Sequence, residues 1–164
     1  MFQEMDIFQY NQDQKLLFKS KSLIDDWYQK YPQLFDEDDL RIAKSQPQYH
    51  FFEWQAAIYM YETHGLLSLV EQYQFKNHKK KQILLDKILS HAPRLVNFIR
   101  DHKKYGKRQC PDLLVYAPDF SNWFFYEVKS DSDELKPKQI EFFEALSEIC
   151  GKPIRIIRFK NLRS

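Results

Sequence analysis

The stretch PDLLVYAPDFSNWFFYEVKSDSDELKPKQ, residues 111–139, decides the fold. It has an apolar run after Asp112, a break rich in turn-forming residues, and a second apolar run at 123–126 that leads to Glu127. This pattern predicts two antiparallel strands joined by a turn. Such a hairpin would bring Asp112 and Glu127, which are fifteen positions apart, to the same end of a sheet.

The residues that follow the hairpin predict a crossover to a third strand. A polar loop at 130–135 leads to Pro137, which favours the first turn of a helix, and Gly151 is a natural residue for its end. The next run, 154–159, is rich in isoleucine and reads as a strand parallel to an earlier one. The order strand, strand, helix, strand therefore indicates an α/β sheet.

Upstream of the hairpin, apolar residues recur mainly at helical spacing. We expect helices at 13–31, 35–43, 50–64, 80–91 and 94–101, and a strand at 66–75, where a continued helix fits nearly as well. Residues 1–46 are interpreted as an accessory helical segment. Residues 47–164 are interpreted as the main domain, with a basic helical insertion at about 76–106.

Composition excludes several classes of protein. The chain has 164 residues, of which 43% are hydrophobic and 16% aromatic, enough for one domain with a proper core. Two cysteines, Cys110 and Cys150, are too few for a disulfide framework and lack the spacing of a zinc site. No apolar run approaches the roughly 20 residues of a membrane-spanning helix, so we expect a cytoplasmic protein without a membrane partner.

The basic charge lies in the middle of the chain. Residues 46–108 hold five acids and eleven bases, whereas the flanking parts have a small negative net charge. Two runs, at 78–81 and 103–108, favour a polyanionic partner such as nucleic acid, although a solvated helix face is the common alternative for one such run. The four acids at 36–39 are interpreted as the solvated, acidic first turn of a helix rather than as a metal site.

The hairpin carries residues suited to phosphodiester hydrolysis. Asp112 and Glu127 would form an oxygen-rich site for Mg²⁺ or Mn²⁺, and the backbone carbonyl of Val128 can add a ligand. Lys129 lies on the same side of its strand as Glu127, because strand side chains alternate, and can orient a water and offset charge on the phosphorus. An exposed cross-strand ion pair is the alternative for the Glu-Val-Lys triplet alone. Its joint occurrence with Pro111-Asp112 favours the catalytic interpretation.

Pro111-Asp112 and Glu127-Val128-Lys129 together resemble the signature of the PD-(D/E)xK nucleases, and residues 130–139 are similar to the VRR-NUC branch. The resemblance implies a restriction-endonuclease-like core, which is a central mixed sheet flanked by helices, with an N-terminal helical segment and a helical insertion. It departs from the family at Arg108-Gln109-Cys110, where glycine commonly precedes Pro-Asp, and in the length of the insertion.

The same resemblance assigns roles to site residues. Asp112 and Glu127 would bind the metal and Lys129 would assist the nucleophile. Glu53 is similar to an additional first-helix acid that completes the metal shell, although a glutamate in a first turn is commonly only helix-stabilising. Gln139 is similar to the motif glutamine of the following helix and would hold the site's geometry, with a polar helix-start residue as the alternative.

The expected function is therefore hydrolysis of DNA by a divalent-metal-dependent nuclease. Structure specificity, the choice between endo- and exonuclease action, and a homodimeric state stay open. Two alternatives are a non-catalytic module that binds nucleic acid or protein on the same fold, and one subunit of a larger nuclease assembly. The residues expected to contact DNA are Lys79, Lys80, Lys81, Lys103, Lys104, Lys107, Arg108, Lys136 and Lys138.

Overall fold

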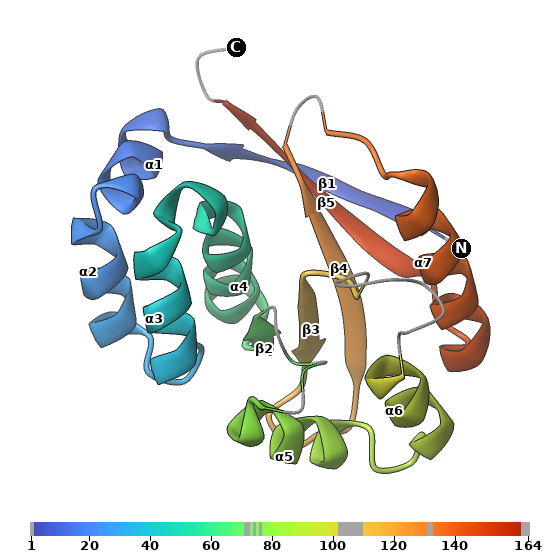
Figure 1. Ribbon diagram of the computed structural model, residues 1–164. Helices are drawn as coiled ribbons and strands as arrows, with labels where there is room; N and C mark the ends of the chain where they lie inside the picture. Colours follow the sequence, from blue (N-terminus) through green and yellow to red (C-terminus); the bar gives the residue numbers. More distant parts are fainter. Residues whose placement is uncertain are drawn as a thin grey trace.

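The protein is described by a computed structural model that covers residues 2–70, 73, 75, 77–101, 110–130 and 133–161. Its centre is a five-stranded mixed sheet with the strand order β1-β5-β4-β3-β2 (Figure 1). The pairs β1/β5 and β5/β4 are parallel, and the pairs β4/β3 and β3/β2 are antiparallel. The strands are β1 (Phe2–Tyr10), β2 (Leu67–Val70), β3 (Leu113–Tyr116), β4 (Trp123–Lys129) and β5 (Ile154–Asn161).

Helices cover both faces of the sheet, as expected for an α/β protein (Figure 1). The first group packs on the face that carries Leu113, Val115 and Tyr126, and the second group packs on the face that carries Leu114 and Phe125. The first group comprises α1 (Gln12–Lys19), α2 (Ser22–Lys30), α3 (Glu37–Ser45), the 3₁₀ helix η1 (Pro47–Tyr49) and α4 (Phe51–His64). The second group comprises α5 (Lys79–Ile88), α6 (Pro93–Arg100) and α7 (Pro137–Cys150).

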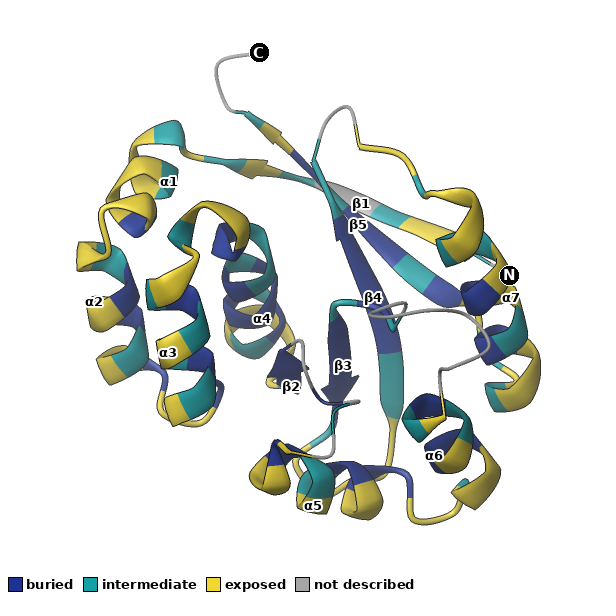
Figure 2. Cartoon of the chain, in the orientation of Figure 1, coloured by how far each residue is buried: buried dark blue, intermediate teal, exposed yellow. Residues whose placement is uncertain are grey.

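Strand β3 of the hairpin is the most deeply buried strand of the sheet (Figure 2). All four residues of β3 are buried because helices cover both of its faces. The predicted hairpin is confirmed, with Leu113 opposite Tyr126 and Tyr116 opposite Trp123. The crossover is also confirmed, because α7 begins at Pro137 and leads to β5, which is parallel to β4. Gly151 ends α7 with a positive φ of 70°, a conformation that glycine adopts readily.

The N-terminal segment differs from the expectation. Residues 2–10 form the edge strand β1, parallel to β5, so the interpretation of residues 1–46 as an accessory helical segment is wrong for this part. The single helix expected at 13–31 is instead two helices, α1 and α2. They are separated at Lys21, whose φ of 78° is left-handed and cannot continue a right-handed helix.

Aromatic packing joins the N-terminal helices to the rest of the domain. The ring of Phe35 stacks on Trp54 of α4 with a centroid distance of 3.7 Å, and Trp27 of α2 stacks on Phe51 at 5.9 Å. All four side chains are buried in the same core as the sheet. Aromatic rings bury large areas and dominate the energetics of such cores, so α1 to α3 are an integral part of the fold.

The other predicted helices and the predicted strand match elements of the structure, although part of the range 66–75 is not described by it. The helices expected at 35–43, 50–64, 80–91 and 94–101 correspond to α3, α4, α5 and α6. The strand expected at 66–75 is the short β2. Both cysteines are free thiols. Within the described ranges, no helix is both long enough and apolar enough to cross a membrane.

Candidate active site

The end of the hairpin brings Asp112 and Glu127 together. The β3/β4 ladder begins with Leu113 opposite Tyr126, so both acids lie just beyond it. The backbone N–H of Asp112 donates to Glu127 Oε1 at 3.1 Å, and the backbone N–H of Val128 donates to Asp112 Oδ2 at 2.8 Å. Each carboxylate thus accepts a hydrogen bond from the backbone of the other strand. This reciprocal bonding fixes the two carboxylates relative to each other.

The direction of the Val128 backbone fits the role predicted for its carbonyl. In an extended strand, the N–H and C=O of one residue point to the same side. Because the Val128 N–H points to Asp112, the Val128 carbonyl faces the side on which Asp112 lies. Coordination of a metal by this oxygen stays a prediction.

Lys129 and Gln139 complete the group that we call the hairpin site, namely Asp112, Glu127, Lys129 and Gln139. Lys129 Nζ lies 3.4 Å from Glu127 Oε2, and the amide of Gln139 donates to the same oxygen at 2.9 Å. Gln139 Oε1 lies 3.5 Å from Lys129 Nζ and also accepts from the backbone N–H of Lys136 at 3.0 Å. Gln139 therefore ties the first turn of α7 to both functional groups of β4.

The electrostatics of Glu127 follow from its burial. The residue is only 3% exposed, and this burial raises its pKa, while hydrogen bonds with Asp112 and the positive charge of Lys129 act in the opposite direction. A single ammonium group at 3.4 Å compensates a buried carboxylate incompletely. The site therefore gains electrostatically from additional positive charge, and its oxygen donors are of the kind that Mg²⁺ and Mn²⁺ prefer.

Glu53 comes from the first turn of α4, which packs on β3 and β4. Its Oε2 lies 3.3 Å from Nδ1 of His50, and both side chains are largely buried. Among the described residues, no group of three or more His, Cys, Asp or Glu side chains is close enough together to hold a metal ion. The structure thus brings Asp112 and Glu127 together without adding Glu53 as a third acid, and its role as a ligand stays a prediction.

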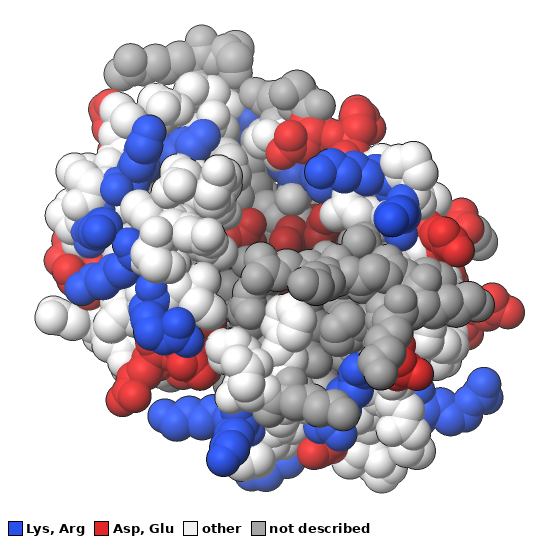
Figure 3. All heavy atoms as spheres, in the orientation of Figure 1, with Lys and Arg blue, Asp and Glu red and all other residues white. Residues whose placement is uncertain are grey.

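The residues expected to contact DNA are exposed, buried or outside the described part of the chain. The exposed group comprises Lys79 and Lys80 at the start of α5, and Lys136 and Lys138 at the start of α7. Figure 3 shows acidic atoms recessed near the middle of one face, with basic side chains over the start of α7 on one side and over the N-terminal helices on the other. The four residues Lys103, Lys104, Lys107 and Arg108 lie outside the described part of the chain. Lys81 is the one residue of this set that is buried in the described structure.

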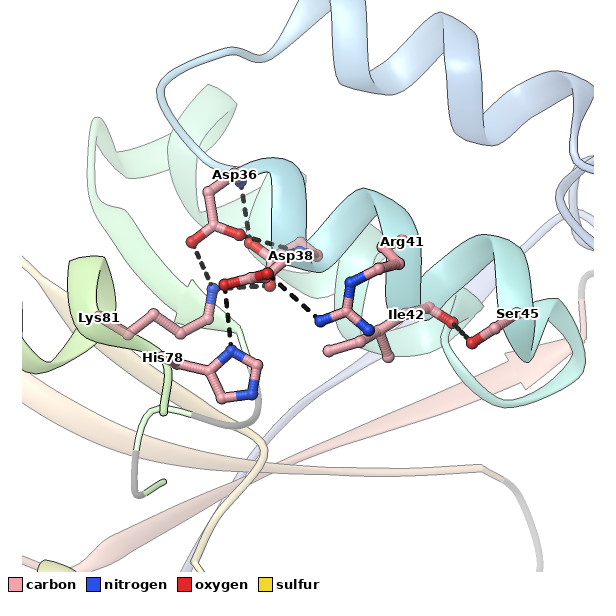
Figure 4. A network of polar contacts seen from close by, with 8 residues as sticks. Asp36, Asp38, Arg41, Ile42, Ser45, His78 and Lys81 are labelled. Carbon is pink, nitrogen blue, oxygen red and sulfur yellow. Dashed lines mark hydrogen bonds and ion pairs between the residues drawn. The ribbon is translucent and has the colours of Figure 1, made fainter. Parts of the chain in front are cut away.

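Lys81 is not a surface residue, so the prediction that it contacts DNA is wrong. It is 2% exposed, and its Nζ donates to Asp36 Oδ2 at 2.8 Å and to Asp39 Oδ1 at 2.7 Å. Beside it, His78 Nδ1 lies 3.1 Å from Asp38 Oδ2. Figure 4 shows these side chains between α3 and the start of α5. We call this group the α3 cluster, namely Asp36, Asp38, Asp39, His78 and Lys81.

The acids of the α3 cluster were expected to form a solvated helix start, and only part of this expectation is right. Asp36 and Asp39 form a capping box, each accepting the backbone N–H of the other, so they do begin a helix. Asp39, however, is 6% exposed and forms an ion pair with Lys81, so it is buried in the protein. One signal was present in the sequence: His78 and Lys81 are three residues apart, so a helical turn places them on one side, facing acids of opposite charge.

Comparison with known proteins adds no family assignment, because no family model matches the chain and no curated protein matches it significantly. Any assignment of function therefore depends on the geometry of the hairpin site.

Proposed function

We propose that this protein is a divalent-metal-dependent nuclease that hydrolyses DNA phosphodiester bonds, and that its α/β fold is of the restriction-endonuclease-like, PD-(D/E)xK type. The observation that supports the proposal best is the reciprocal hydrogen bonding of Asp112 and Glu127, with Lys129 and Gln139 both directed at Glu127 Oε2. A buried glutamate beside a second carboxylate, a lysine and a glutamine at a strand end is the kind of cluster that marks functional sites.

The donors of the hairpin site suit Mg²⁺ or Mn²⁺. Asp112 and Glu127 would hold the ion, and the carbonyl of Val128 would add a neutral oxygen. A metal bound there would polarise the phosphate and lower the pKa of a bound water. The carboxylates are already oriented by backbone N–H groups, which reduces the cost of arranging them when the ion binds.

Lys129 and Gln139 have distinct roles in this mechanism. The Lys129 ammonium group is tied only loosely, at 3.4 Å and 3.5 Å from its neighbours, so it can turn toward a phosphate oxygen and offset charge that grows in the transition state. Gln139 holds Glu127 Oε2 through its amide N–H and faces Lys129 with its oxygen. It is a positioning residue that holds Glu127 and Lys129 in place relative to each other.

The start of α7 provides a natural contact for the DNA backbone. Lys136 and Lys138 are exposed and lie within three residues of Gln139. A helix N-terminus also favours anions, because its first N–H groups and its dipole point at them. These lysines would hold phosphates next to the scissile bond, and Lys79 and Lys80 at the start of α5 would extend the contact.

The proposal is tested by cleavage of labelled linear, flap and four-way DNA with Mg²⁺ or Mn²⁺. We expect the wild type to cut at least one substrate and to lose this activity in EDTA. Glu127→Gln, which keeps the size of the side chain but removes its charge, should reduce cleavage by about a thousandfold or more.

The matched control is Glu134→Gln, an exposed acid of the loop before α7, which should cut like the wild type. Full activity of Glu127→Gln, or cleavage that persists in EDTA, would contradict the proposal. A wild type that cuts no substrate and binds no Mn²⁺ would instead favour a non-catalytic binding module.

A further inference from the structure

The peptide group between Pro111 and Asp112 is hydrogen-bonded at both ends. Its carbonyl, that of Pro111, accepts from the hydroxyl of Tyr73 at 2.7 Å. Its N–H, that of Asp112, donates to Glu127 Oε1 at 3.1 Å. Because a peptide group is planar, these two bonds together fix its orientation. The same peptide thus connects a distant tyrosine with the buried carboxylate of the hairpin site.

The surroundings of Tyr73 fix the direction of its hydroxyl. The residue is 0% exposed and lies in the core between the sheet and the helices α5, α6 and α7. Its ring packs near Phe125 of β4, with a centroid distance of 6.5 Å. A buried tyrosine hydroxyl needs a hydrogen-bond partner, and here the Pro111 carbonyl accepts its hydrogen.

Helices α5 and α6 hold the backbone of Tyr73 in turn. The side-chain amide of Gln82 in α5 donates to the Tyr73 carbonyl at 2.5 Å. Arg100 of α6 donates through Nε to Gln82 Oε1 at 2.6 Å, and through a second nitrogen to Asp86 at 3.0 Å. A continuous series of contacts therefore runs from α6 through α5 and Tyr73 to the peptide that precedes Asp112.

We propose that Tyr73 is a positioning residue of the hairpin site, held by Gln82 and acting on Glu127 through the Pro111–Asp112 peptide. This inference rests on the proposed nuclease function. A hydrogen bond accepted by a peptide carbonyl polarises the same peptide and strengthens the bond that its N–H donates. Tyr73 thereby strengthens the bond to Glu127 Oε1, and fixes the direction in which the carboxylate presents its oxygens.

The role assigned to Tyr73 also gives the helical insertion a function beyond contact with phosphates. Helices α5 and α6 lie between β2 and β3 in the chain, upstream of the Pro111-Asp112 motif. Through Gln82 and Arg100 they support the residue that orients this motif. Residues that orient metal ligands typically change metal affinity or activity by about 10- to 100-fold when they are replaced.

The test compares Tyr73→Phe, which removes only the hydroxyl, with Tyr116→Phe. Tyr116 is a tyrosine of the same core that lies outside the hairpin site, so it controls for the loss of a tyrosine hydroxyl from this core. Three quantities are measured: Mn²⁺ affinity by titration calorimetry, cleavage as a function of Mn²⁺ concentration, and hydrogen exchange of the Asp112 amide in the metal-free protein.

We expect Tyr73→Phe to weaken Mn²⁺ binding by about 10- to 100-fold and to raise the Mn²⁺ concentration needed for cleavage by a similar factor. The Asp112 amide should exchange roughly tenfold faster, because its bond to Glu127 is weakened. Tyr116→Phe should match the wild type in all three. Gln82→Met, which loosens Tyr73 without altering it, should shift each quantity in the same direction by a smaller factor.

If Tyr73→Phe equals Tyr116→Phe in Mn²⁺ affinity and in Asp112 exchange while the wild type cleaves DNA, the positioning role is wrong and the proposed function stands. If the wild type neither binds Mn²⁺ nor cleaves DNA, the proposed function fails and the positioning role fails with it.

Discussion

The protein places a lysine beside a buried carboxylate in two places, and the two places differ in how closely the lysine approaches the acid. In the α3 cluster, Lys81 Nζ lies 2.7 Å and 2.8 Å from two aspartates. In the hairpin site, Lys129 Nζ lies 3.4 Å from Glu127 and 3.5 Å from Gln139. The first lysine is 2% exposed and the second 12%. The same residue types therefore form a closed contact in one place and an open one in the other.

We interpret the α3 cluster as an ion pair that stabilises the fold, and the hairpin site as a group of charges that can take part in chemistry. In the α3 cluster the aspartates also cap a helix, so their oxygens are committed to backbone N–H groups and to Lys81. The cluster ties α3 to α5. In the hairpin site the carboxylates are oriented by the backbone, but the cation beside them is held loosely. Lys129 can therefore turn away from Glu127 without breaking a short ion pair.

Replacement of Lys81 should have the largest effect on stability. Lys81→Met leaves Asp36 and Asp39 without their cation, and loss of one partner of a buried ion pair typically costs about 3–5 kcal/mol. We expect denaturant unfolding to show a loss of this size. The exposed neighbour provides the control, since Lys80→Met should leave the free energy of unfolding unchanged. Equal stability of the two variants would mean that the α3 cluster does not hold the fold together.

Replacement of Lys129 should instead reduce DNA cleavage strongly and affect stability less. Lys129→Met should reduce DNA cleavage by about 10²- to 10³-fold, because an ammonium group that stabilises transition-state charge is lost. The free energy of unfolding should fall by less than in Lys81→Met, since Lys129 is farther from its acid and Glu127 keeps its bonds from Asp112 and Gln139. A variant that unfolds as easily as Lys81→Met and still cleaves DNA would reverse the assignment of the two clusters.

The ionisation of Asp39 should make the stability of the α3 cluster depend on pH, and this effect should be smaller than the loss of Lys81. Burial raises the pKa of Asp39 to about 7 in the folded protein, although the charge of Lys81 acts in the opposite direction. The unfolded value is about 3.9, so the folded state holds this proton more tightly. The stability that the proton contributes is present at low pH and is lost as the pH rises from about 4 through 7.

Asp39→Asn removes this titration and leaves that of Asp36 in place. Relative to Asp39→Asn, the wild type should therefore become progressively less stable between pH 4 and pH 7, in unfolding titrations at fixed salt. A stability difference that stays constant across this range would show that Asp39 is already ionised at pH 4.

Local patterns predicted the parts of the fold that are made by neighbouring residues. The hairpin joins strands separated by a short turn, and α7 joins β4 to β5 directly, so alternation, turn residues and caps were enough. The edge strand β1 was missed because it pairs with β5, with Phe2 opposite Ile154 at the other end of the chain. No local signal specifies such a pairing, which depends on how the whole sheet packs.

The distinction between local and long-range contacts also explains which residues of the site could be predicted. Asp112, Glu127, Lys129 and Gln139 lie within one hairpin and the turn of helix that follows, and the structure brings all four together. Lys81 was misassigned because its partners Asp36 and Asp39 are more than forty residues away, and a run of lysines alone does not reveal them. Tyr73 belongs to no sequence motif, and its bond to Pro111 in the structure reveals a link to the site.

Titration of the protein with Mn²⁺, followed by calorimetry, tests the central claim most directly. The wild type and Asp39→Asn should bind Mn²⁺ with the same affinity, because the α3 cluster takes no part, whereas Glu127→Gln and Asp112→Asn should lose this binding. The claim would be contradicted if the wild type shows no saturable Mn²⁺ binding, or if Glu127→Gln binds Mn²⁺ as tightly as the wild type.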